Sequence, residues 1–159
     1  MKQKSLARWL KAVIIGAALC GAVIYLLVIP DFGQSIAADN PEFAYCYWPW
    51  LIFLWCTAPP CFAALILGWR IAKNVGNDRS FCMENARALK WIAWLALADA
   101  AFFFAGNVVF LFFNMNHPGV VLLSLVAVFA GIAVTIAAAT LSHLVGKAAE
   151  LQEQSDLTI

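Results

Sequence analysis

The chain has 159 residues, of which 64% are hydrophobic and only 12% are charged. Charged residues make up about a quarter of a typical soluble domain, so this composition excludes a soluble globular protein. The net charge of +1 is uninformative as a total, whereas the placement of the ten Lys and Arg residues along the chain is informative.

Four long apolar stretches follow one another along the chain, and each has roughly the 20 residues that a helix needs to cross about 30 Å of hydrocarbon. We therefore predict an all-α polytopic membrane protein in which residues 1–147 form a single bundle of four transmembrane helices. The predicted spans are residues 10–29, 48–69, 91–113 and 119–143. Residues 148–159 are predicted to be a polar cytoplasmic tail, either a frayed helix end or disordered.

The basic residues occupy alternate connections. They lie before the first span, between the second and third spans, and after the fourth: Lys2, Lys4, Arg8, Lys11, Arg70, Lys73, Arg79, Arg87, Lys90 and Lys147. Short cytoplasmic segments are enriched in Lys and Arg. The pattern predicts a bacterial cytoplasmic (inner) membrane protein with both termini inside the cell.

The first span could be mistaken for a cleaved signal peptide, because a basic segment precedes its apolar core. Its apolar run, Ala12–Ile29, is long and is followed by Pro30 rather than by a small-residue cleavage site. We expect a retained anchor whose helix ends at Pro30.

The outer half of the first hairpin concentrates aromatic residues at 43–50. We interpret this segment as an interfacial aromatic belt, with an aromatic or quinone-type ligand site as the alternative. Further along, Pro59 and Pro60 predict a kink in the second span, because they remove two backbone donors. Thr57 is a local candidate to pair the carbonyls that they free near Trp55 and Cys56.

The inner connection between Arg70 and Lys90 is the only sizeable cytoplasmic segment. Asp78 or Ser80 is a candidate helix N-cap there. The apolar spacing after Phe81 predicts an amphipathic helix over 81–90 that continues into the third span, with Glu84 and Arg87 close enough to pair.

Asp99 is the one carboxylate predicted to be buried in a span, and Asn107 follows it. An ionised carboxylate at the membrane centre costs at least about 2.5–3.5 kcal/mol, so we expect a neutral group facing the bundle interior. Its role is either packing, with Asn107, Thr57, Ser124 or Thr135 as hydrogen-bond partners, or proton or cation binding.

No motif points to an enzyme, a cofactor or a metal. His117 and His143 are predicted to lie on opposite membrane faces, which excludes a shared haem or metal site. The five cysteines form no C-x-x-C pair, and the sequence has no phosphate-binding loop, nucleophile elbow or metalloprotease motif. We expect a non-enzymatic protein without direct nucleic-acid binding.

Two short motifs resemble those of the bacterial "domain of unknown function 2975" family of small four-helix membrane proteins. One is Lys-Ser-Leu-x-x-Trp-Leu-Lys over 4–11, and the other is Asp-Arg-Ser-Phe-x-x-Glu-Asn-x-x-x-Leu over 78–89. The resemblance extends over about residues 4–147. It implies a partnership with a small helix-turn-helix regulator and directs attention to Phe81, Glu84, Asn85 and Arg87 as a docking surface. An ordinary helix start with a lipid-facing basic rim explains the same residues.

The leading hypothesis is a membrane protein that acts through protein contacts with such a regulator. A proton- or cation-coupled transporter or channel subunit built around Asp99 is the first alternative. An accessory subunit of a larger membrane complex is the second. Oligomeric state, including a homo-oligomer, stays open.

Overall fold

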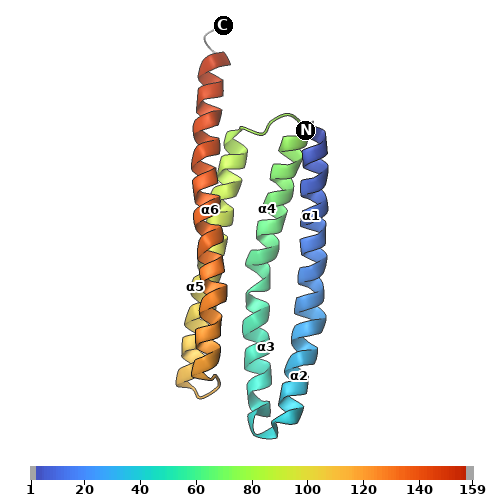
Figure 1. Cartoon of the computed structure of the whole chain (residues 1–159), viewed down its shortest axis with the longest axis vertical. Helices are drawn as coiled ribbons and strands as arrows, with labels where there is room; N and C mark the ends of the chain where they lie inside the picture. The colour runs from blue at the N-terminus through green and yellow to red at the C-terminus, as the bar shows by residue number, and fades with distance from the viewer. Residues whose placement is uncertain (1–2, 157–159) are drawn as a thin grey trace.

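The computed structural model describes residues 3–156 as four long helical rods joined by short connections (Figure 1). The chain runs through α1 (Gln3–Val23), a π-helical turn (Ile24–Val28) and α2 (Ile29–Asp39), then through a 3₁₀ turn (Pro41–Cys46), α3 (Tyr47–Cys56) and α4 (Ala58–Gly76). The second half consists of α5 (Met83–Phe112) and α6 (Pro118–Asp156). Lys2 lies outside the described residues.

All four rods are long and apolar enough to cross a membrane. The predicted all-α class is therefore confirmed, with four helices that are candidates to span a membrane, whereas the bounds of the spans stay a prediction. The chain forms two helical hairpins: α1 packs on α4, α5 packs on α6, and α4 and α5 join the hairpins. Most of the large apolar side chains face outward, as expected where lipid is the solvent.

The first rod does not end at Pro30, so that prediction was wrong. The helix continues from Gln3 to Asp39, about 55 Å, and only Asn40 and the 3₁₀ turn remain of the predicted outer connection. The π turn explains the continuation, because the N–H of Ile29 donates to the carbonyl of Ile24, five residues back. In this register the carbonyl of Tyr25 would pair with residue 30, which has no N–H. The indole of Trp55 donates to that carbonyl instead, at 2.9 Å.

The second rod breaks at Thr57 rather than bending smoothly. Pro59 and Pro60 then fall in the first turn of α4, where backbone N–H groups have no partner within the helix. Thr57 bonds locally, but its hydroxyl donates to Leu54 O at 2.7 Å rather than to the carbonyls of Trp55 or Cys56 that the sequence suggested, and its backbone N–H contacts the carbonyls of Leu54 and Trp55.

The α5–α6 hairpin has a seam of small residues at seven-residue spacing. On α5 the buried positions are Ala86, Ala93, Ala100 and Asn107; on α6 they are Ser124, Ala138 and Val145, with Gly131 in register. A Cβ on Gly131 would lie 2.9 Å from that of Ala100, so the backbones approach closely. Such small-residue seams drive helix packing in membranes, where burial of apolar surface contributes little.

The N-terminus, the α4–α5 connection and the C-terminal half of α6 lie at the same end of the molecule (Figure 1). Gln3 contacts Ser80, and Gly146 lies against Ala86. Every Lys and Arg among residues 3–156 lies in or near this end, which we call the basic end. The predicted tail is helical as far as Asp156, since Ala, Glu, Leu and Gln favour helix.

Candidate functional site

The connection of residues 77–82 at the basic end, hereafter the basic-end loop, is held in one conformation by backbone bonds. The carbonyl of Asn74 accepts from the N–H groups of Asn77 and Arg79, both at 3.0 Å. Asp78 takes the left-handed conformation, with φ of 60°, which turns the chain away from α4.

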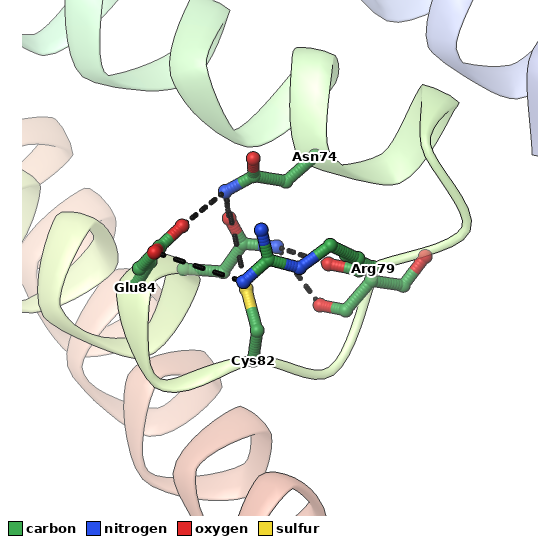
Figure 2. A network of polar contacts seen from close by, with 6 residues as sticks. Asn74, Arg79, Cys82 and Glu84 are labelled. Carbon is green, nitrogen blue, oxygen red and sulfur yellow. Dashed lines mark hydrogen bonds and ion pairs between the residues drawn. The ribbon is translucent and has the colours of Figure 1, made fainter.

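A pair of asparagines clamps this loop from the inside (Figure 2). Asn85, only 2% exposed, donates to the carbonyls of Arg79 and Ser80 at 3.2 and 2.9 Å. Its own side-chain oxygen accepts from Asn74 at 2.8 Å. Both donors and the acceptor of Asn85 are therefore paired, and the loop is fixed to the ends of α4 and α5.

Charged side chains cover the outside of the clamp. The amide of Asn74 also reaches Glu84 at 3.4 Å and the sulfur of Cys82 at 3.9 Å. Glu84 forms an ion pair with Arg79 at 3.7 Å, and both side chains are well exposed. The pairing of Glu84 with Arg87 suggested by their spacing is not the one that forms, because the loop brings Arg79 closer.

The start of α5 differs from the prediction. Cys82, in an extended conformation, is the N-cap residue, and it forms no side-chain cap. Asp78 and Ser80 are therefore not caps, and Ser80 instead lies 3.1 Å from the side chain of Gln3. Phe81 precedes the helix because the extended Cys82 separates it from the first helical residue, Met83.

The four predicted docking residues separate into two groups. Phe81, Glu84 and Arg87 are exposed, Phe81 to 58%, and together form one accessible surface. Asn85 is buried beneath them, so it supports the surface and cannot touch a partner.

Asp99 and Asn107, predicted as one intramembrane polar site, are not brought together. Asn107 is fully buried, donates to Phe103 O at 2.8 Å and accepts from Asn116 at 3.1 Å. It therefore fastens the turn between α5 and α6. One oxygen of Asp99 accepts from the thiol of Cys61 at 3.6 Å, and its other oxygen is buried without a hydrogen bond among the described residues.

The other predicted partners of Asp99 form bonds elsewhere. The hydroxyls of Ser124 and Thr135 donate to carbonyls of their own helix, at Val121 and Gly131. Thr57 donates to Leu54, so the hydroxyl of Tyr25, 2.8 Å away, must donate to Thr57.

The aromatic segment at 43–50 borders a cavity of about 700 Å³ between the first hairpin and the α5–α6 turn. Its lining is mainly apolar and includes Phe43, Tyr47 and Trp50. The indole of Trp50 donates to Met115 O at 2.8 Å, so this side chain connects the two hairpins.

Sequence reasoning missed Asn74, Cys61 and Tyr25. Each of these residues lies on a different helical segment from the residue that it contacts: Asn74 contacts Asn85, Cys61 contacts Asp99, and Tyr25 contacts Thr57. The sequence around each of the three contains no motif that would have singled it out. The seven-residue spacing of small residues on α5 and α6 could have indicated which faces of these two helices meet.

Comparisons with known proteins group the chain with a membrane protein and with a family of unknown function. A family model described as "Protein of unknown function (DUF2975)" matches residues 31–159, which include the Phe81–Leu89 motif but not the motif before the first span. The chain is similar to the "Uncharacterized membrane protein YoaS" of Bacillus subtilis (strain 168), with 29% identity over 149 residues that cover 92% of each protein. No solved structure matches.

Proposed function

The chain belongs to the DUF2975 family, and from that membership and the geometry of the basic end we propose that this integral membrane protein is non-enzymatic and acts through protein contacts. The basic end faces the cytoplasm in this proposal, and the membrane is the bacterial cytoplasmic one. The support for that orientation is the one-sided distribution of Lys and Arg.

The observation that carries the proposal is an exposed aromatic side chain on a rigid loop. Surface loops are usually mobile, yet a buried, fully paired asparagine fixes this one. Phe81 is thereby held out from the helix ends. Aromatic anchors on pre-organised loops bind partners well, because less conformational entropy is lost on association.

The charge of the basic end indicates which kind of protein surface would bind there. Between residues 70 and 90 the exposed charged side chains are mostly basic, with Arg70, Lys73, Arg79, Arg87 and Lys90 against Asp78 and Glu84. A complementary protein would present an apolar pocket with acidic residues around it. The family resemblance suggests a small helix-turn-helix regulator, which would bind through a face other than its basic DNA-contacting surface.

Co-purification tests the proposal. The full-length protein, extracted in detergent, should retain the helix-turn-helix protein encoded by an adjacent gene, and Phe81→Ala should reduce the recovered partner at least about tenfold. Phe112→Ala is the matched control, because Phe112 is 81% exposed at the opposite end of α5. Equal recovery with both variants, or no such partner with the unmodified protein, would overturn the proposal.

Coupled transport is a second candidate, supported by the unpaired oxygen of Asp99. In proteoliposomes, a proton or cation flux that depends on the protein should disappear with Asp99→Asn. A flux unchanged by that substitution rules this candidate out.

A further inference from the structure

A cleft of about 440 Å³ lies midway along the molecule, between the outermost helices α1 and α6, with α4 and α5 between them. All four helices contribute to its lining, so the row of helices is curved around it. The size is within the range of small-molecule sites, roughly 300–1,000 Å³. The lining is apolar apart from three side chains, Tyr25, Cys61 and Asp99.

The carboxyl of Asp99 is the one charge-bearing group of this lining. Cys61 contacts one of its oxygens, and the other oxygen has no hydrogen bond among the described residues. The described Lys and Arg residues lie toward the basic end, far from this depth, so none can neutralise an ionised Asp99. Without a ligand the carboxyl is therefore expected to be neutral, and an ionised Asp99 requires a positive charge that only a bound ligand can supply.

Aromatic rings complete the lining. Tyr25 and Phe62 lie with their ring centroids 6.4 Å apart, and Phe103 lines the same cleft. Aromatic faces attract cations, and the attraction is stronger where water is excluded. The hydroxyl of Tyr25 is already bound to Thr57, so Tyr25 contributes its ring rather than a free donor.

We propose that this cleft binds a lipophilic organic cation, with its positive charge against Asp99 and its apolar groups against the surrounding rings and aliphatic side chains. A lipophilic cation can reach the site laterally from the bilayer, because the cleft lies midway along the four helices that are long enough to span a membrane. The proposal requires binding only. It depends neither on a cytoplasmic partner nor on transport, and its failure would leave both candidates of the preceding section standing.

Equilibrium dialysis of the purified full-length protein in detergent tests it, with tetraphenylphosphonium as the probe. Saturable binding should weaken at least about tenfold in Asp99→Asn, because the substitution removes the charge and keeps the shape. Glu42→Gln, which neutralises a carboxylate outside the cleft, is the matched control and should bind as the unmodified protein does. Tetraphenylborate has the same shape and the opposite charge, and it should not compete.

A second pair of variants leaves the carboxyl intact. Ala17 lines the cleft, whereas the neighbouring Gly16 faces open space. Ala17→Trp should fill the cleft and abolish binding, and Gly16→Trp should not. Absence of saturable binding to the unmodified protein, equal binding by Asp99→Asn, or competition by tetraphenylborate would each overturn the proposal.

Discussion

Asn85 and Asp99 lie on the same face of α5, two heptads apart, and both point toward α4. Their surroundings offer them different numbers of hydrogen-bond partners. Asn85 uses both donors and its acceptor, two of them on loop carbonyls. Asp99 has a single thiol contact and one unpaired oxygen. The reason is position. Beside the basic-end loop, carbonyls outside any helix are free to accept, whereas at mid-span the helices have already paired their own backbone groups.

A polar side chain inside a membrane bundle therefore supports the fold where nearby backbone groups are unpaired. Where the nearby backbone groups are already paired, the side chain is available to a ligand. Asn107, close to the far end of α5, follows the first pattern, since it bonds both its own helix and the following turn.

The largest expected effect is that of Asn85→Ala. Two loop carbonyls and the amide of Asn74 would lose their buried partner, and we expect a loss of about 2–4 kcal/mol in the free energy of unfolding. Unfolding in detergent by titration with a denaturing surfactant measures it. Asn40→Ala is the control, because Asn40 is exposed and bonds a carbonyl of the preceding helical turn. Equal stability of the two variants would refute the structural role of Asn85.

The next largest effect is expected for Asn74→Ala, which should lower the free energy of unfolding by about 1–2 kcal/mol, because it removes one of the three hydrogen bonds of Asn85. In the Asn85→Ala background the same substitution should cost much less, since the two residues share one network. Simple additivity of the two losses would show that they are not coupled.

Asp99→Leu should change stability with the opposite sign. Replacing a carboxyl that has one weak contact by an apolar side chain removes a desolvation cost, so we expect a gain of up to about 1 kcal/mol. The same surfactant titration measures it. A loss as large as that of Asn85→Ala would mean that Asp99 is a structural residue after all.

The smallest effect is expected at the exposed ion pair. Arg79→Ala should change stability by less than about 0.5 kcal/mol, because solvent screens the charges of Arg79 and Glu84. Any effect should shrink as the salt concentration rises. A larger loss that is insensitive to salt would show that Arg79 acts through the loop backbone instead.

Much of the architecture follows from composition and charge. Hydropathy and span length determine four transmembrane helices, since an unpaired backbone is not tolerated in lipid. The basic residues at 70–90, together with those near the N-terminus and Lys147, predict one common end, and the structure groups those it describes there. The number of spans and the grouping of the basic residues depend on the lipid solvent and on short segments of the chain. Both can therefore be predicted from the sequence.

The tertiary structure alone decided which polar groups pair. Pro30 ends a helix by local rules, yet the π turn and the indole of Trp55 carry the helix past it. Asn85 reads as a surface residue by its motif, yet Asn74 and two loop carbonyls bury it. Asp99 lines a cleft only because Cys61, Tyr25 and residues of three other helices pack around it. Trp55, Asn74 and Cys61 each come from a different helix than the residue they contact, and only packing brings them within contact distance.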